Sequence, residues 1–418
     1  MKVLILGAGV VGVTSAYYLS RAGCEVTVVD RQAQVAAETS FANGGQISVS
    51  HAEPWANPQT LRKLLHWLGR RDAPLRFHLR ADPQLWRWAL RFLRECTPAR
   101  TRYNIRQLVA LGLYSRAQLQ RLRADTGLQY DQRTRGILHV YTSARELAAA
   151  RAPAELMRAL GCERRVLSVD EAVAIEPALQ AVAPRLAGAT YSPDDESGDA
   201  QRFTHALAGV CAQAGVRFLM NHTVTALRAA DGRLAHVEAT DAQGAFVRLD
   251  ADAYVLALGS YSPLLARPLG LRLAIYPAKG YSLTMPVKDP ARAWSAAVTD
   301  EEHKIVFSRL GERLRVAGTA EFAGYDRSLD AARCAVLLRR TEELFPGGGD
   351  AAQARYWAGL RPSTPSNVPY IGRTRYPNLF LNTGHGTLGW THACGSGQAI
   401  ADIVCGREPE VELARTSA

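Results

Sequence analysis

The stretch "KVLILGAGVVGVTSAYYLSRAGCEVTVVD" (Lys2–Asp30) decides the fold. Val3–Leu6 is a short apolar run of the kind that forms a strand buried on both faces of a parallel sheet. A G-x-G-x-x-G pattern follows it directly, and Thr14–Arg21 has the pattern of a helix. Glu25–Val29 repeats the buried-strand pattern. The stretch therefore predicts a strand–helix–strand unit with a glycine turn after its first strand.

This unit has the spacing of a dinucleotide site. The first glycine permits a tight turn, the second lets a pyrophosphate touch the backbone, and the third lets the helix pack on the strand. The helix N-terminus offers N–H groups and the positive end of its dipole to the phosphates, and the acid after the second strand can accept hydrogen bonds from ribose hydroxyls. The pattern does not separate NAD from FAD. The residues assigned to the dinucleotide are Gly7, Gly9, Val10, Val11, Gly12, Asp30 and Arg31.

A second glycine-containing stretch, "AAETSFANGGQIS" (Ala36–Ser48), follows closely. Hydroxyl side chains followed by a glycine pair suit another approach to the pyrophosphate and an extended backbone beside a ring, although an ordinary turn is the alternative. The candidate residues here are Thr39, Ser40, Asn43, Gly44, Gly45, Gln46 and Ile47.

Close to the C-terminus, "LNTGHGTLGWTHACGSGQ" (Leu381–Gln398) holds five glycines and no charged residue. A disordered tail would not explain the apolar run Leu379–Leu381 in front of it. The alternative to a tail is a loop whose backbone comes very close to a flat group. Ala393, Gly397 and Ala401 are small residues spaced four apart, which allows close packing on the sheet.

The middle of the chain predicts further strands. Val216–Met220 and Val224–Arg228 read as strands, and "DAYVLALG" (Asp252–Gly259) as a buried strand entering a glycine turn that closes over the nucleotide. Val224, Leu258 and Gly259 are the candidate contacts. Helices are expected at Leu61–Arg70 and Leu85–Phe92, and a strand within Gly311–Phe322. With no repeat or linker, the chain is expected to weave between two parts.

Composition limits the class of protein. At 418 residues and 47% apolar content, the chain can form one large domain or two intertwined ones. Its seven cysteines include no C-x-x-C, which argues against a zinc ribbon or a disulfide framework and fits a reducing cytosol. The ten histidines lack metal-binding spacing, so no metal is expected. Neither a signal peptide nor a membrane-spanning stretch is recognised, and the expected location is cytoplasmic.

The net charge of +11 is concentrated in residues 61–106, where twelve Lys or Arg face three acids. Such a segment suits an anionic partner, a membrane leaflet or a nucleic acid, or is a plain solvated surface. Leucines at helical spacing between Leu61 and Leu68, with flanking basic residues, resemble a helix lying on anionic lipid, although they would equally suit the core.

Several motifs together resemble one family. The chain is similar to the FAD-dependent amine and amino-acid oxidoreductases of the D-amino-acid oxidase superfamily, and most to bacterial D-amino-acid dehydrogenases of the small-subunit type. The resemblance spans residues 1 to about 400 and rests on "VLILGAGVVGVTSAYYL", "ETSFANGGQIS", "PWANP", "DESGDAQRFT", "YPAKGYSLTMP", "RLRVAGTAEF", "GLRPSTPSNVPYIGRT" and "LNTGHGTLGWTHACGSGQ".

The resemblance implies an α/β fold: a Rossmann-like FAD-binding domain interleaved with an α+β substrate domain built on an antiparallel sheet. Residues 1–48, 195–265 and 355–418 would form the first, and 49–194 and 266–354 the second. The implied reaction oxidises a D-amino acid to an imino acid, which water hydrolyses to a 2-oxo acid and ammonia. Electrons would pass to a membrane quinone rather than to oxygen, peripheral contact through residues 61–106 would serve that delivery, and no nucleic acid is expected.

The resemblance also implies site residues. Arg361 matches an arginine that grips the substrate carboxylate, as a guanidinium can with two parallel hydrogen bonds. Tyr276, Tyr281, Lys279 and His51 are further pocket candidates. The C-terminal loop would contact the flavin through Gly384, Gly386, Thr387, Leu388 and Gly389.

Related enzymes attach FAD through a cysteine near the position of Arg361. This chain has none between Cys334 and Cys394, so non-covalent FAD is expected. It departs from the dehydrogenases at Ser366–Asn367, where they commonly carry an acid, and in "SVSHAEPW", and both departures bear on which amino acid is preferred. Two other functions stay open: an oxygen-using amine oxidase of glycine or sarcosine oxidase type, and a non-catalytic basic flavoprotein that binds membrane or nucleic acid.

Overall fold

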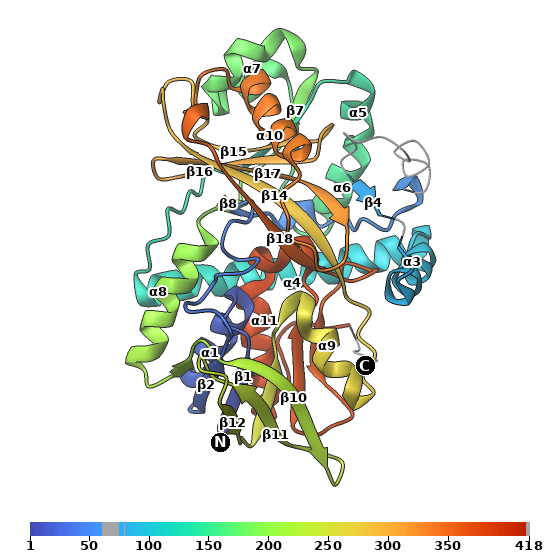
Figure 1. The fold of residues 1–418 in the computed structure, drawn as a ribbon. Helices are drawn as coiled ribbons and strands as arrows, with labels where there is room; N and C mark the ends of the chain where they lie inside the picture. The colour runs from blue at the N-terminus through green and yellow to red at the C-terminus, as the bar shows by residue number, and fades with distance from the viewer. Residues whose placement is uncertain (61–74, 79, 415–418) are drawn as a thin grey trace.

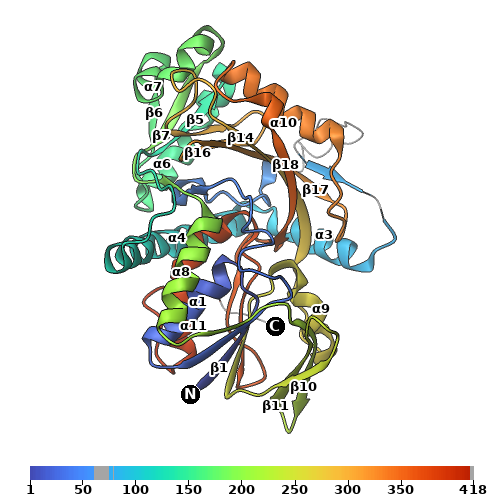
Figure 2. The ribbon, with the colours of Figure 1, turned by 60° about the vertical axis from the view of Figure 1, so that its left-hand side comes forward.

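The structure is a computed structural model and describes residues 1–60, 75–78 and 80–414. The helix expected at Leu61–Arg70 lies outside the described residues. Figure 1 shows two halves, one around the N-terminal strands and one around a larger sheet. The long helix α4 (Pro98–Thr126) crosses between them in both views (Figures 1 and 2).

The first half is built on a six-stranded sheet in the order β19-β20-β13-β1-β2-β9. Its strands pair in parallel except for β19 with β20. The buried apolar runs form its centre, which confirms the strands predicted from them. The bounds are β1 Lys2–Leu6, β2 Glu25–Val29, β9 Arg217–Leu219, β13 Ala253–Leu256, β19 Tyr370–Arg373 and β20 Leu379–Thr383.

Three helices cover this sheet together with α4: α1 (Val10–Arg21), α8 (Ala200–Gln213) and α11 (Gly389–Val404). The sequence predicts that small residues of α11 pack on the sheet. Gly397 instead meets α1, since a Cβ placed on it would lie 2.9 Å from the carbonyl carbon of Thr14. Gly395 approaches α4 in the same way, with its Cβ position 2.8 Å from Cα of Ser115. Glycines therefore let α11 pack tightly between two helices.

The second half is built on a nine-stranded sheet in the order β18-β14-β17-β16-β15-β5-β7-β6, with β4 beside β17. Its pairs are antiparallel apart from β15 with β5 and β17 with β4, which confirms the antiparallel sheet expected for this half. The bounds are β4 Leu75–Phe77, β5 Ile137–Tyr141, β6 Arg165–Leu167, β7 Gly188–Ser192, β14 Tyr276–Pro286, β15 Ala297–Asp300, β16 Ile305–Leu310, β17 Arg313–Phe322 and β18 Arg355–Ser363.

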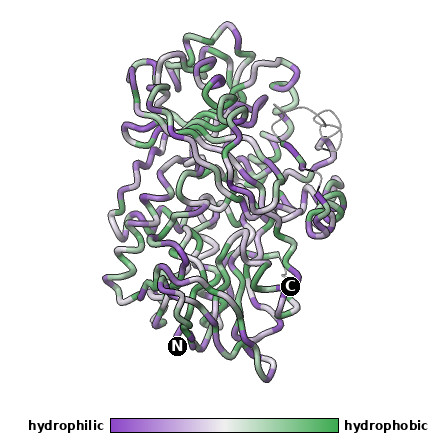
Figure 3. The backbone as a smooth tube through the Cα atoms, viewed as in Figure 1, coloured by the Kyte–Doolittle hydropathy of each residue, from purple (hydrophilic) through white to green (hydrophobic). Residues whose placement is uncertain are grey.

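Helix α10 (Ala331–Leu344) packs on β14 and β17, and Trp294, Phe307 and Phe345 fill the core beside them. Figure 3 shows apolar chain gathered in the middle of this sheet and polar chain on the outer loops. The helix predicted at Leu85–Phe92 is α3, where Leu85, Trp88 and Phe92 are buried as its pattern predicts. The remaining helices of four or more residues are α3 Pro83–Glu95, α5 Ala144–Ala149, α6 Arg151–Ala159, α7 Val169–Ile175, α9 Ser262–Ala266 and the 3₁₀ helix Pro177–Arg185.

The described residues also form two small sheets. One consists of β10 (Thr223–Ala230), β11 (Arg233–Thr240) and β12 (Phe246–Leu249), and the other pairs β3 (Gln46–Ile47) with β8 (Glu196–Ser197). The sequence analysis places residues 355–418 in the cofactor half, and in the structure β18 of this range pairs with β14 of the larger sheet. Among the described residues, no helix is long and apolar enough to cross a membrane.

Candidate active site

A cavity of about 600 Å³ lies where the two halves meet. One wall comes from the loops that follow β1, β2, β13 and β20, all at the carboxyl ends of parallel strands, where ligands bind in open α/β sheets. The other wall comes from β14, β16, β17 and β18 of the larger sheet. Residues distant in the sequence therefore share one site.

The first glycine loop needs its glycines for steric reasons. Gly7 has φ +111°, and a Cβ on it would lie 2.6 Å from the carbonyl oxygen of Ala257. A Cβ on Gly12 would lie 1.9 Å from the carbonyl oxygen of Gly7. Gly9 and the N-terminal turn of α1 are thereby held at the cavity, where backbone donors suit a pyrophosphate.

Asp30 closes this loop from the end of β2. Its Oδ2 accepts a hydrogen bond from the Ala8 amide at 2.7 Å, and its Oδ1 accepts one from Gln32 at 2.9 Å. Burial raises the pKa of the Asp30 carboxyl above its ordinary value, although those two amides act to lower it. Asp30 therefore fixes the conformation of the loop and lines the cavity. Beside it, the guanidinium carbon of Arg31 lies 4.0 Å from the centre of the Tyr261 ring.

The second glycine stretch is fixed from both halves. Ser40 accepts a hydrogen bond from the Val10 amide at 3.1 Å, while Thr39 donates to the Leu360 carbonyl of β18 at 2.8 Å. A Cβ on Gly44 would lie 2.7 Å from a methyl of Val306. Six of the seven candidates line the cavity, namely Thr39, Ser40, Asn43, Gly44, Gly45 and Gln46. Ile47, the seventh, is in the core and does not line it.

The C-terminal loop brings unsatisfied polar groups to the cavity. Gly386 has φ +54°, and the loop leads into α11, whose N-terminus has no capping side chain. A helix start leaves amide donors unpaired and carries the positive end of the helix dipole. Asn382 Oδ1 and His385 Nε2 are buried, have no hydrogen-bond partner in the described structure, and belong to residues of the cavity wall. These donors and acceptors fit a flat polar group such as a flavin ring.

Most of the remaining cofactor candidates also line the cavity: Val11, Val224, Leu258, Gly259, Thr387, Leu388 and Gly389. Gly12 and Gly384 do not, and act through packing instead. Gly384 has φ +83° and lies against Thr364, with its Cβ position 2.9 Å from the Thr364 methyl.

Arg361 presents an unpaired cation to the cavity. Its guanidinium lies across Gly280, where a Cβ added to the glycine would be only 2.2 Å from the Arg361 Cζ. Its Nη1 donates to the Thr319 carbonyl at 3.0 Å. Among the described residues, no carboxylate lies within ion-pair distance of it, and burial lowers the pKa of Arg361 to about 10. A partly buried cation without a counter-ion is a site for an anion.

Thr319, which accepts this hydrogen bond, has an unusual backbone conformation. It has φ +57°, which is costly for a β-branched residue. The pairing of β14 with β17 shifts register between Lys279 and Tyr281, and this bulge turns the Thr319 carbonyl toward Arg361. The Thr319 hydroxyl is buried without a hydrogen-bond partner and its residue lines the cavity. Strain and an orphaned hydroxyl thus occur together at the arginine, as at many functional sites.

The structure does not bring Lys279 or Tyr276 into the cavity wall. The ammonium of Lys279 lies 3.3 Å from Glu321 and 3.0 Å from Asp326, so it is a buried ion-paired group. Tyr276 donates its hydroxyl to Asp82 at 2.8 Å. Tyr281 lines the cavity, but its hydroxyl donates to Glu321 at 2.7 Å, and burial raises its pKa.

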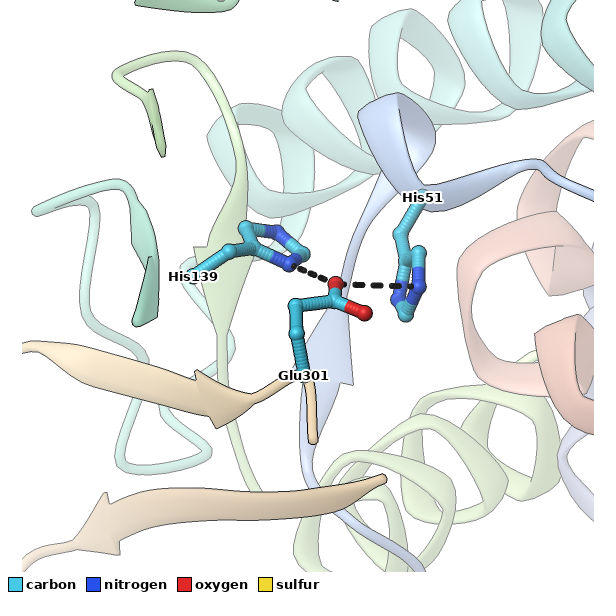
Figure 4. A group of neighbouring side chains, drawn as sticks. All are labelled: His51, His139 and Glu301. Atoms are coloured by element: carbon cyan, nitrogen blue, oxygen red, sulfur yellow. Dashed lines mark hydrogen bonds and ion pairs between the residues drawn. The ribbon is translucent and has the colours of Figure 1, made fainter. Parts of the chain in front are cut away.

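His51 does line the cavity, and Figure 4 shows it facing Glu301 together with His139. Glu301 Oε1 lies 2.8 Å from His139 Nδ1 and 3.5 Å from His51 Nε2, and Lys304 pairs with the other oxygen. Burial lowers the pKa of His51 to about 4, so this histidine is neutral at pH 7. Burial acts to raise the pKa of Glu301, but Lys304 and the two histidines hold it well below its ordinary value.

Two histidines and a carboxylate can hold a metal, and the three ligand atoms lie within 4.8 Å of one another. The sequence analysis expects no metal here, since the three residues come from positions far apart. Lys304 already neutralises the carboxylate, and a divalent ion would add positive charge beside that ammonium. We therefore assign the cluster no metal.

Sequence reasoning missed several residues of the wall. Thr319 comes from β17 and Trp357 from β18, and Tyr261 follows the expected nucleotide turn. Asn382 and His385 lie inside the C-terminal stretch, where their position between glycines was the available signal.

The parallel sheet, the glycine loops and the unpaired polar groups define a dinucleotide-binding protein whose cavity wall also carries the Arg361 cation. The chain belongs to the family of FAD dependent oxidoreductases called DAO, whose sequence model matches residues 2–403. The resemblance, the fold class and FAD as the cofactor are thereby confirmed, and the protein is an enzyme.

Curated relatives cover nearly the whole chain. A protein of Dechloromonas aromatica (strain RCB) named D-amino acid dehydrogenase is 56% identical over 413 residues, covering 99% of both chains. One of Paramagnetospirillum magneticum (strain ATCC 700264 / AMB-1) with the same name is 54% identical, covering 99% of this chain and 97% of the relative. Among solved structures, glycine oxidase from Geobacillus kaustophilus matches with a TM-score of 0.76 at 23% identity, covering 100% of this chain and 99% of its own. That likeness shows the fold.

Proposed function

We propose that the enzyme oxidises D-amino acids to 2-oxo acids and ammonia and passes the electrons to a quinone or another acceptor that is not oxygen. The observation that carries the proposal is Arg361, a partly buried cation of the cavity wall that has no counter-ion among the described residues. The name shared by the curated relatives supports the substrate class.

Arg361 would bind the substrate carboxylate. Its planar guanidinium offers two parallel donors, and Gly280 leaves it room to lie flat over β14. The Thr319 carbonyl takes one Nη1 hydrogen bond and so fixes the direction of the remaining donors. A carboxylate held there fixes the position of the α-carbon beside it, which is the part of catalysis that positioning supplies.

FAD, when bound, supplies the hydride acceptor, and the protein orients and stabilises it. The glycine loops after β1 and β2 would hold its pyrophosphate and ribose, and Gly44 and Gly45 would lie beside its ring. The N-terminus of α11 directs unpaired amides at the cavity, where they favour negative charge. We propose that binding is non-covalent, since no cysteine belongs to the cavity wall.

Two titratable residues of the cavity wall, His51 and Lys304, would add no unpaired charge to the site. His51 is neutral, and the ammonium of Lys304 is paired with Glu301. Loss of a hydride leaves positive charge on the α-carbon of the substrate, and neither group would add an unpaired positive charge beside it. His51 can also accept a hydrogen bond from the substrate amine. Water would then hydrolyse the imino acid product.

One experiment tests the substrate class. The purified holoenzyme is mixed anaerobically with D- and L-amino acids, cyclic ones included, and the flavin absorption band is followed. Bleaching by D-amino acids and not by their L-enantiomers is expected. Bleaching by L-amino acids alone would contradict the proposal.

A second measurement tests the acceptor. The reduced enzyme is exposed to air or to a soluble quinone, and both reoxidation rates and hydrogen peroxide are measured. Fast reoxidation by quinone with little peroxide is expected, whereas rapid stoichiometric peroxide would identify an oxygen-using amine oxidase.

We propose a peripheral membrane contact on the cytoplasmic side through residues 61–106. Helix α3 supports it, because Trp86, Leu90 and Leu93 expose 50%, 61% and 49% of their surfaces. They recur at helical spacing beside Arg87, Arg91 and Arg94, the pattern of a helix that enters the surface of anionic lipid.

Vesicle flotation tests this contact. The protein should float with anionic vesicles at low salt and be released at high salt. A Trp86→Ser, Leu90→Ser, Leu93→Ser variant and an Arg62, Lys63, Arg70, Arg71 charge-removal variant should both remain in solution. Equal behaviour with neutral and anionic vesicles would contradict the contact.

A further inference from the structure

Two cysteines far apart in the sequence meet at the end of the cofactor half. The Sγ atoms of Cys24 and Cys405 lie 3.8 Å apart, although 381 positions separate them. All seven cysteines belong to the described residues, and the other five are buried, whereas this pair is partly exposed. Of the thiols, these two are therefore in reach of solvent and of each other.

The helices α1 and α11 bring them together. Cys24 follows the turn that ends α1, where its amide donates to the Leu19 carbonyl at 3.1 Å. Cys405 caps the C-terminus of α11 and donates to the Ala401 carbonyl at 3.0 Å. The two helices pack along each other, and their opposite ends line the cavity. Hydrogen-bonded helix ends thus fix both Cα positions, and side-chain rotation remains free to change the sulfur separation.

We propose that Cys24 and Cys405 form a thiol pair that a two-electron oxidant such as hydrogen peroxide converts to a disulfide. A disulfide has an S–S bond of about 2.05 Å, so the sulfurs must approach by about 1.8 Å, within the range of χ1 adjustment. The other five cysteines are buried and would stay reduced.

The surroundings assign different roles to the two thiols. Burial, and then the neighbouring Cys405, raise the pKa of Cys24 to about 11, so Cys24 is protonated at neutral pH. The guanidinium of Arg407, which is paired with Asp402 at 2.8 Å, also interacts with the Cys405 sulfur. Because Cys24 is the protonated thiol, we assign it the resolving role and Cys405 the attacking role.

The reaction balances with one peroxide. The Cys405 thiolate attacks one peroxide oxygen, the O–O bond breaks, and hydroxide leaves to give a sulfenic acid. Cys24, losing its proton, attacks that sulfur, the S–S bond forms, and a second hydroxide leaves. With the two thiol protons, the products are one disulfide and two waters: two thiols are oxidised and one hydrogen peroxide is reduced.

The cross-link would join the C-terminal ends of the two helices whose N-terminal ends line the cavity. It would close a loop of nearly the whole chain, and a disulfide restricts the unfolded chain more as its loop grows. For a protein of this size, we expect the melting temperature of the oxidised form to be higher by about 5 °C.

The test uses the reduced holoenzyme treated with hydrogen peroxide. Free thiols are then alkylated, and peptides are mapped without reduction. We expect a linked Cys24–Cys405 peptide with the other five cysteines alkylated, a higher melting temperature, and reversal of both by dithiothreitol. Cys24→Ser and Cys405→Ser should lose the linked peptide and the shift, and Cys211→Ser, at a buried cysteine of α8, should keep both.

Two results would overturn the proposal. One is a sulfinic acid on Cys405 with the Cys24 thiol intact in the wild-type protein. The other is the same melting shift in Cys24→Ser as in the wild type. Because linkage is read on the unaltered protein, a variant that fails to fold does not remove the test.

Discussion

Replacing Arg361 with leucine tests the site most directly, because the structure gives the size of the effect. Burial lowers the pKa of Arg361 from 12.5 to about 10, which corresponds to on the order of 3 kcal/mol of lost solvation. A substrate carboxylate paired with the guanidinium would recover that energy. Removing the cation should therefore lower kcat/KM for amino acids by about a hundredfold.

The design separates binding from folding. Arg361→Lys keeps the charge but loses the two-pronged geometry, and should fall between the wild type and Arg361→Leu. Arg355→Leu places the same substitution on the exposed start of the same strand, and should behave as the wild type. FAD content is measured for each variant by absorbance, and should be unchanged in all three.

The assay combines steady-state kinetics with binding of a simple carboxylate anion, followed by the change in flavin absorption. Arg361→Leu should weaken the binding of that anion by a factor similar to the decrease in kcat/KM. Near wild-type values of both, with full FAD content, would show that the substrate carboxylate binds elsewhere and refute the reasoning from the unpaired cation.

Three other outcomes are expected. Acid precipitation should release the yellow FAD into the supernatant, and flavin kept in the pellet would contradict non-covalent binding. Gly12→Ala should lose FAD and lower the melting temperature, because its Cβ would lie 1.9 Å from the Gly7 carbonyl, whereas Gly209→Ala, with nothing within 4 Å, should not. Burial raises the pKa of Asp195 from 3.8 to about 6, so the folded protein binds that proton more tightly, and the stability it contributes at low pH is lost as pH rises through 6. Urea unfolding at pH 4 and pH 7 should show Asp195→Asn losing about 2 kcal/mol less than the wild type over that interval, and equal losses would count against the shifted pKa.

The sequence by itself determined the parts that depend on neighbours along the chain. The strand, glycine turn, helix and second strand from Lys2 to Val29 form as expected. A Cβ on Gly12 would meet the Gly7 carbonyl oxygen, so this contact lies within the unit itself. The buried face of α3 follows from local periodicity in the same way. These segments carry the cofactor half, and so the class of protein was predictable.

Tertiary structure decided which side chains reach the cavity. Neighbouring residues of a strand point to opposite faces, so Lys279 and Tyr281 both reach Glu321 while Gly280 lies under Arg361. The sequence around β14 does not state which face meets the cavity; the bulge in its pairing with β17 and the positive φ of Thr319 do.

Contacts between side chains that are far apart in the sequence could not be predicted from it either. His139 and Glu301 come together because β5 and β15 are neighbours in the larger sheet, and Cys24 and Cys405 because α1 and α11 end side by side. Periodicity and spacing describe contacts over a few residues. The meeting of segments hundreds of residues apart depends on sheet order and helix packing, which only the folded chain fixes.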